Sequence, residues 1–210
     1  MTKIIALTQL KGGCGRSTVA SNLAGELSKI GKTLLVDCDV PQGTSSSWFA
    51  IRQEKGLHSN LEATTANSAS QLMKRVEQKA DYIILDTPPR LAEITRVALV
   101  ASDLCLIPVG ASPAELWATG DLVELIQEAE KVRKVTSRIV WTRYRSNTKL
   151  AQELSELAGK ELGLKALKTT MGMRVAYVNA LSEGLTGAEV GDAAAKRETQ
   201  ALVAEIRKLK

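Results

Sequence analysis

A glycine-rich run near the start of the chain, QLKGGCGRST over residues 9–18, carries the residue types best suited to chemistry. Gly12, Gly13 and Gly15 allow the backbone to curl so that successive N–H groups point at one anion. A helix that begins near Ser17 adds its positive N-terminal end at the same point, and the Ser17 hydroxyl can reach Mg²⁺. The run therefore predicts a phosphate-binding loop.

A tight connection between a strand and a helix is the alternative interpretation of this run. The apolar segment before it, the glycines, a cation and Ser17-Thr18 all align, and together they favour phosphate binding. The pattern G-x-x-x-x-G-K-S/T is nevertheless not strictly met. Lys11 comes early in the loop, and Arg16 stands where a lysine is expected to cradle phosphate. Arginine keeps the charge but is a wide planar fork, so the sequence predicts nucleotide binding with slow or absent hydrolysis.

Carboxylates follow other apolar segments. Asp37 and Asp39 end the segment TLLVDCD, and Asp86 ends YIILD. In open α/β sheets ligands bind at the carboxyl edge of the strands, where these side chains are expected to meet. Carboxylates beside a phosphate loop suit a magnesium nucleotide, because they hold metal-bound water and orient the attacking water. Capping of the next helix is the alternative for any one of them.

Short apolar runs alternate with longer amphipathic segments along the chain, and this alternation predicts right-handed βαβ units. The expected fold is α/β, with a single doubly wound, mainly parallel sheet, helices on both faces and one domain over residues 1–210. Strands are predicted at 3–8, 33–37, 82–86, 104–109, 138–142 and, shorter, near 166–168. Helices are predicted at 17–30, 69–79, 91–101, 113–134, 149–162, 174–181 and 193–209.

The composition is that of a globular protein, with 44% hydrophobic and 24% charged residues. No apolar run approaches the ~20 residues of a membrane helix, and the N-terminal segment leaves no room for a signal peptide. An odd number of widely spaced cysteines, 3 in all, indicates free thiols in a reducing cytoplasm. The net charge of +5 is a mild bias toward polyanionic partners.

Several segments carry a specific family resemblance. KGGCGRST resembles the deviant Walker A motif, KGGxGK[ST]T, of the ParA/MinD family of dimerising ATPases. VDCDVPQGT is similar to the family's VDxDPQGN motif, with Val40 inserted before Pro41 and Gln42. ILDTPP resembles its Walker B motif, and LCLIPVGASPAELWATGDL is similar to the strand and proline-containing turn that follow. The resemblance covers essentially the whole chain and is strongest to small, ParF-like partition ATPases.

The resemblance implies ATP and Mg²⁺ as cofactors and an ATP-dependent sandwich homodimer. Lys11 would reach the partner's phosphates and Asp39 would orient the hydrolytic water, which makes these the expected catalytic residues. Mg²⁺ would be held by Ser17, Asp37 and Asp86. The nucleotide-binding residues would be Lys11, Gly12, Gly13, Cys14, Gly15, Arg16, Ser17, Thr18 and, near the base, Arg143.

Family members of this kind bind DNA without sequence preference, and a ParB/ParG-like partner or cargo adaptor stimulates hydrolysis. The resemblance therefore implies a cytoplasmic, nucleoid-associated protein that positions a plasmid, chromosome region or protein microcompartment. A solvated basic surface is the alternative interpretation of the basic residues in the second half. The residues selected as DNA contacts are Arg145, Lys149, Arg174, Lys196 and Arg197.

Alternatives from other functional classes remain open at this point. Arg16 favours a nucleotide-dependent scaffold without useful hydrolysis. The apolar stripe of the segment 193–210 would suit a MinD-like membrane-surface helix, although packing on the domain core is the expected role and no membrane contact is predicted. A metabolic P-loop ligase of the dethiobiotin-forming type is the last alternative.

Overall fold

The computed structural model describes residues 2–89, 92–145 and 149–209, and of residues 92 and 149–152 it describes the backbone alone. The strands form one 7-stranded sheet in the order β3-β2-β4-β1-β5-β6-β7, and every pairing is parallel. The strands are β1 (Lys3–Leu7), β2 (Thr33–Asp37), β3 (Leu61–Thr65), β4 (Tyr82–Asp86), β5 (Leu104–Gly110), β6 (Thr136–Thr142) and β7 (Lys165–Ala166).

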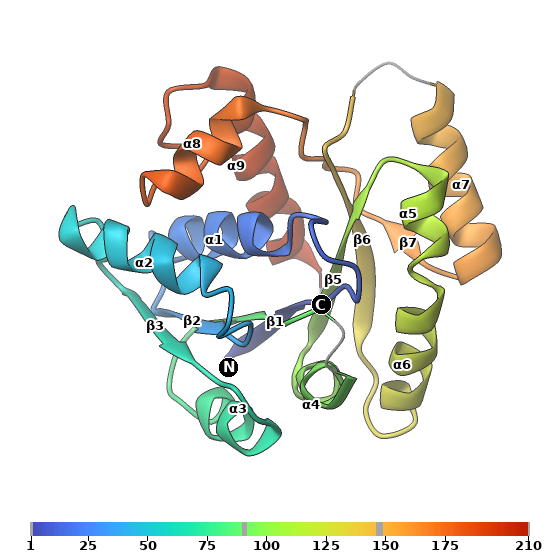
Figure 1. Ribbon diagram of the computed structural model, residues 1–210, viewed down its shortest axis with the longest axis horizontal. Coiled ribbons are helices and arrows are strands. Elements are labelled where there is room, and N and C mark those ends of the chain that lie inside the picture. The colour runs from blue at the N-terminus through green and yellow to red at the C-terminus, as the bar shows by residue number, and fades with distance from the viewer. Residues whose placement is uncertain (1, 90–91, 146–148, 210) are drawn as a thin grey trace.

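Helices cover both faces of the sheet, as the sequence predicts. They are α1 (Arg16–Leu27), α2 (Thr44–Glu54), α3 (Ala69–Val76), α4 (Ala92–Ala101), α5 (Pro113–Trp117), α6 (Gly120–Glu130), α7 (Lys149–Leu162), α8 (Val175–Ser182) and α9 (Ala193–Lys208). Figure 1 shows α1, α2, α8 and α9 gathered on one side of the sheet and α3 and α4 on the other.

Alternate side chains of the strands enter hydrophobic clusters on opposite faces of the sheet. Ile5 and Leu7 of β1 pack with α1 and α9, while Ala6 faces α3 and α4. The same alternation in β5 sends Leu106 to the first core and Ile107 toward α6 and α7. Apolar residues on both faces explain why these strands read as continuous hydrophobic runs. No helix of the described residues is both long and apolar enough to cross a membrane.

The structure corrects the sequence predictions in several places. Strand β3 and helix α2 were not predicted. The single helix predicted over residues 113–134 is interrupted between α5 and α6, where the hydroxyl of the buried Thr119 donates to the carbonyl of Glu115 at 3.1 Å. The last strand is the two-residue β7, which begins one position and ends two positions before the predicted strand. Leu91, the first residue of one predicted helix, lies outside the described residues.

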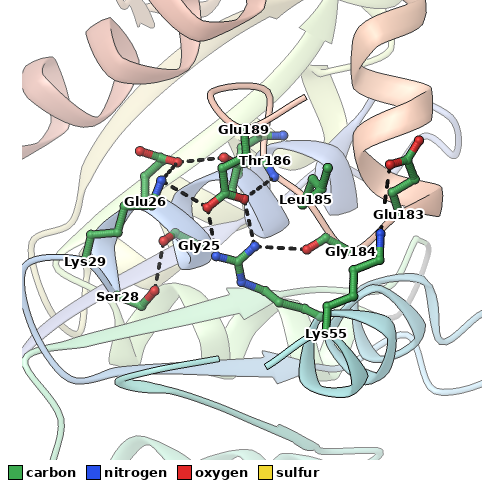
Figure 2. Close-up of polar contacts among 12 residues, drawn as sticks. Gly25, Glu26, Ser28, Lys29, Lys55, Glu183, Gly184, Leu185, Thr186 and Glu189 are labelled. Atoms are coloured by element: carbon green, nitrogen blue, oxygen red, sulfur yellow. Dashed lines mark hydrogen bonds and ion pairs between the residues drawn. The ribbon is translucent and has the colours of Figure 1, made fainter. Parts of the chain in front are cut away.

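A buried polar network fixes the loop between α8 and α9 against α1 and α2 (Figure 2). Arg52 of α2 is 3% exposed and donates to the carbonyl of Gly184 at 2.9 Å and to both carboxylate oxygens of Glu189 at 2.8 and 3.0 Å. The Thr186 hydroxyl donates to Glu26 of α1 at 2.6 Å. Burial opposes ionisation of Glu189, but hydrogen bonds from Arg52 and Thr186 outweigh it and lower its pKa to about 2.

Candidate nucleotide-binding site

The predicted phosphate loop connects β1 to α1 at the carboxyl edge of the sheet. Gly13 and Gly15 have φ values of 73° and 91°, in the left-handed region that favours glycine. Gly15 caps α1, and the first helical hydrogen bond runs from the Val19 amide to the Gly15 carbonyl. The loop borders a cavity of about 510 Å³, lined by Gly12, Gly13, Cys14, Gly15, Arg16, Ser17, Thr18, Asp39, Gln42, Thr44, Pro89 and Leu181.

Asp86 is the buried acid of this site. It ends β4 between β1 and β2, in register with Leu7 and Asp37, and is 1% exposed. Neither carboxylate oxygen has a hydrogen-bond partner, although the Ser17 and Ser45 hydroxyls lie close enough to act on its charge. Burial raises the pKa of Asp86 to about 6, and Asp37 adds to that shift, whereas Ser17, Ser45 and Arg16 oppose it.

An unpartnered, buried carboxylate beside a serine at a helix N-terminus is an oxygen donor set of the kind that Mg²⁺ takes in nucleotide sites. Asp86 and Ser17 therefore fit the predicted ion. Among the described residues, no group of three or more histidine, cysteine, aspartate or glutamate side chains is arranged to hold a metal by itself. A hard cation at this site would thus depend on further oxygen ligands from phosphate and water.

Asp37, another predicted magnesium ligand, accepts hydrogen bonds from neighbouring residues. Its Oδ1 accepts from the Asp39 amide at 3.0 Å, and its Oδ2 accepts from the amide and hydroxyl of Ser46 at 2.9 and 2.7 Å. These bonds hold the turn after β2 and the start of α2. Asp39 itself lines the loop cavity, and its pKa is raised by burial, with Arg16 opposing the shift. The inserted Val40 is exposed, and Gln42 still lines the cavity.

Arg16 turns back into its own loop. Its Nη1 donates to the carbonyl oxygens of Gln9 and of Lys11, the latter at 3.1 Å, and the side chain is buried. Its Nε is also buried and has no hydrogen-bond partner. The guanidinium of Arg16 is therefore hydrogen-bonded to backbone carbonyls of the phosphate loop itself.

The side chains of Lys11 and Arg143 both contact Glu115, an acidic residue that the sequence analysis did not select. Lys11 Nζ lies 3.8 Å and Arg143 Nη2 2.5 Å from Oε1 of Glu115, at the start of α5. Nearby, the Gln9 side chain donates from Nε2 to the Thr119 hydroxyl at 3.1 Å, and that hydroxyl donates to the backbone carbonyl of Glu115. Only the segment SPAEL could have indicated this residue, because it places a helix-capping serine and a carboxylate shortly after β5.

A second, mostly apolar cavity of about 630 Å³ adjoins the phosphate loop. Its walls come from the phosphate loop, the end of β6 and α8. The Thr142 hydroxyl joins the end of β6 to the loop by donating to the Cys14 carbonyl at 2.8 Å. Arg143 has a φ of 51°, so a left-handed residue directs the chain out of β6. The lining includes Gly13, Gly15, Thr18, Arg143, Arg145, Met171, Met173, Arg174, Tyr177 and Leu181.

The described residues among those selected as DNA contacts differ in their surroundings, although Arg145 and Arg174 line the same cavity. Arg174 is paired with Glu198 at 2.6 Å, and the Glu198 hydrogen bonds raise its pKa. Arg145 is exposed beside Met173, whereas Lys196 and Arg197 are exposed near the start of α9. The side chain of Lys149 lies outside the described part of the structure.

All three cysteines are buried and free of disulfides. Burial raises the pKa of each thiol, to about 12 for Cys105 and also upward for Cys14 and Cys38. Arg16 partly opposes the shift at Cys14, while the neighbouring carboxylates add to it at Cys38.

Comparisons with known proteins show which proteins this chain resembles. A family model described as AAA domain matches residues 2–70 and 54–140. The maintenance of carboxysome distribution protein A of Halothiobacillus neapolitanus is 30% identical over 195 residues, 89% of this chain and 87% of its own length. The chromosome-partitioning ATPase Soj of Thermus thermophilus is 30% identical over 220 residues, with 88% and 87% covered. An ATP complex of a McdA variant from Cyanothece superposes with a TM-score of 0.80 at 19% identity, covering 98% of this chain and 96% of that one.

Proposed function

This chain belongs to the ParA/MinD family of ATPases, and from that premise we propose that it is an ATP-dependent dimer that positions a cargo on DNA. The observation that carries the proposal is the phosphate loop with the unpartnered Asp86 buried beside it. Residues 1–210 act as one ATPase domain. The cargo class follows the relatives, which are named for carboxysome distribution and chromosome partitioning.

ATP and Mg²⁺ are the proposed ligands of the loop. Backbone amides of residues 12–18 surround the phosphates, and the N-terminal end of α1 adds its positive partial charge. Ser17 and Asp86 serve Mg²⁺ directly or through water, with Asp37 holding the neighbouring turn. The ion supplies charge neutralisation at the phosphates. The 630 Å³ cavity beside Arg143 receives the nucleoside.

Hydrolysis requires an oriented water and compensation of phosphate charge. Asp39 lines the cavity and is the proposed orienting group for that water. Lys11, at the exposed rim of the loop, is the proposed group that crosses to the phosphates of a second protomer. A partner protein of the ParB/ParG type would stimulate this step, and turnover of the free chain would be slow.

A nucleotide-dependent scaffold is the second candidate function, and Arg16 is the observation that favours it. The guanidinium already donates to the carbonyls of Gln9 and Lys11, so it must leave them before it can neutralise a phosphate. A MinD-like membrane helix is less well supported. The apolar stripe of α9, including Leu202 and Ile206, is buried against the core.

The deciding experiment is binding to a random-sequence DNA duplex with ATP, ADP or no nucleotide, at stated salt concentrations. ATP-specific binding that weakens steeply with salt is expected, because only the dimer presents two basic surfaces. ATP hydrolysis is measured in parallel with and without DNA. Confirmed ATP binding without DNA binding in any state would contradict the nucleoid proposal, and ATP-dependent binding without turnover would favour the scaffold.

A further inference from the structure

The carboxylate of Glu115 joins three separate segments next to the phosphate loop. Its Oε1 is shared by Lys11 of the loop and Arg143 after β6, and its Oε2 accepts from the Gly110 amide at 2.8 Å. The acid is only 15% exposed, whereas the two cations are 45% and 46% exposed. Glu115 is therefore held in the wall of the protein, and the cations reach it from the surface.

The backbone around this acid leaves room for it. A Cβ at Gly110 would lie 2.5 Å from Glu115 Oε2 and 2.6 Å from Arg143 Nη2, closer than such atoms approach. Arg143 keeps its left-handed backbone, with a φ of 51°. The ion pair between Glu115 and Arg143 thus packs directly against Gly110, and its 2.5 Å separation makes it the closer of the two contacts to Glu115.

Lys11 is held more weakly than Arg143. Its Nζ lies 3.8 Å from the shared oxygen, beyond hydrogen-bond distance, and it competes there with the closer guanidinium. A partly exposed pair of this kind can be broken at small cost. Lys11 is therefore the member of the cluster that can leave.

We propose that Glu115 is a positioning residue that retains Lys11 on its own protomer until the nucleotide-bound dimer forms. The inference rests on the proposed function, in which Lys11 acts across the dimer. Transfer of Lys11 to a partner's phosphates must first break its contact with Glu115, while Arg143 remains to balance the acid. Removing the charge of Glu115 releases Lys11 early and favours the dimer.

The contact is tested first in the nucleotide-free chain, where no dimer is needed. Amine-reactive labelling at low stoichiometry, read by mass spectrometry, gives the reactivity of Lys11. In Glu115→Gln, whose amide oxygen can still accept from Gly110, we expect Lys11 to react about two- to fivefold faster. Lys32, paired with Glu62 at 3.2 Å, is the internal reference and should not change. Unchanged labelling of Lys11 would overturn the proposal.

The consequence for assembly is tested by a double-mutant cycle. Dimer dissociation constants are measured by sedimentation velocity with Mg²⁺ and a non-hydrolysable ATP analogue for the wild type, Glu115→Gln, Lys11→Ala and the double variant. Glu115→Gln should tighten the dimer about two- to fivefold when Lys11 is present and have no effect when it is absent. Glu128→Gln, which breaks the exposed pair with Arg96, is the matched control and should match the wild type.

The outcomes separate this proposal from the proposed function. An equal effect of Glu115→Gln with and without Lys11, or no effect in a chain that dimerises, would overturn the role of Glu115 alone. The wild type could also bind nucleotide and stay monomeric while Glu115→Gln dimerises. That result would support the retention of Lys11 by Glu115 and contradict the proposed dimerisation of the wild type. Monomers in every variant, with nucleotide bound, would overturn both.

Discussion

Asp86 combines complete burial with an unpartnered charge, and this makes its protonation state a measurable property of the site. Its folded pKa of about 6 lies above the ordinary aspartate pKa of 3.8, so the folded chain binds the proton more tightly than the unfolded chain. The resulting stabilisation is complete below pH ~4 and is lost as the pH rises through 6. The shift corresponds to about 3 kcal/mol.

Asp86→Asn removes this charge, and we expect it to stabilise the nucleotide-free chain by about 2 kcal/mol at pH 8 and little at pH 4. The same change should abolish magnesium-dependent ATP turnover. Urea unfolding without magnesium at both pH values, together with a hydrolysis assay, checks the two effects. Asp121→Asn on the exposed first turn of α6 is the control and should alter neither. A variant less stable than the wild type at pH 8 would contradict the buried-charge argument.

Arg16 determines how well the phosphate loop can neutralise a bound phosphate. Lysine is compact and fits a phosphate cradle that a planar fork fills poorly, so Arg16→Lys should raise the rate constant of ATP hydrolysis about tenfold. Arg16→Ala should instead lower it and weaken nucleotide binding, because the positive charge is lost. Single-turnover hydrolysis and calorimetric titration with ATP separate the chemical step from binding. Equal rates for the arginine and lysine proteins would show that the slow step lies elsewhere.

Among the elements, the loop between α8 and α9 depends on its polar network with α1 and α2. Glu189→Gln leaves the nearly buried Arg52 without its charge partner, and we expect a loss of about 3 kcal/mol in the free energy of unfolding at pH 7. In the wild type, stabilisation by Glu189 is present above the ordinary glutamate pKa of 4.5 and disappears as the pH falls toward 2.

Glu183→Gln supplies the matched control for that prediction. It removes the same charge from the same loop region, but its pair with Lys55 spans 3.9 Å between exposed side chains. We therefore expect a change below about 0.5 kcal/mol. Thermal and urea unfolding of both variants provide the comparison. Similar losses for the two would show that burial of Arg52 does not determine the energy of the network.

The sequence predicted the strands and helices that contain runs or stripes of apolar residues. It did not predict β3 and α2, whose side chains are only partly buried. The strand LEATT, β3, lies at the sheet edge with one fully buried residue, so it lacks the apolar run of a central strand. Helix α2 begins with TSSS and buries few side chains, which leaves its periodicity weak. The phosphate loop was predictable because its backbone conformation requires glycines at fixed positions within a few residues. Glu115 was not, because its role arises only where β5, β6 and the loop meet.

The whole molecule has a net charge of +5, and binding to DNA would require basic residues to lie together on one surface. Lys3 at the start of β1 donates to the Ile206 carbonyl near the end of α9 at 2.8 Å, so the start of α9 points toward the opposite, nucleotide-binding end. Lys196 and Arg197 lie there and are exposed. These two predicted DNA contacts can therefore be tested together.

Lys196→Ala with Arg197→Ala should therefore weaken ATP-dependent DNA binding and reduce the slope of log affinity against log salt by about 2 per protomer. Fluorescence anisotropy of a labelled duplex across a salt series measures both quantities. Lys208→Ala, at the far end of the same helix, is the control and should leave the slope unchanged. An unaltered slope in the double variant would place the contact surface on other elements.

The burial of Cys14, Cys38 and Cys105 also has a practical consequence. Thiols that are enclosed and kept protonated react slowly with maleimides, so the native chain is already suited to site-specific labelling. One cysteine introduced at Trp117, which is 63% exposed on α5, would be the preferred point of attachment for a fluorophore. Energy transfer between two such labels would then report the assembly and separation of protomers in real time, with every native cysteine retained.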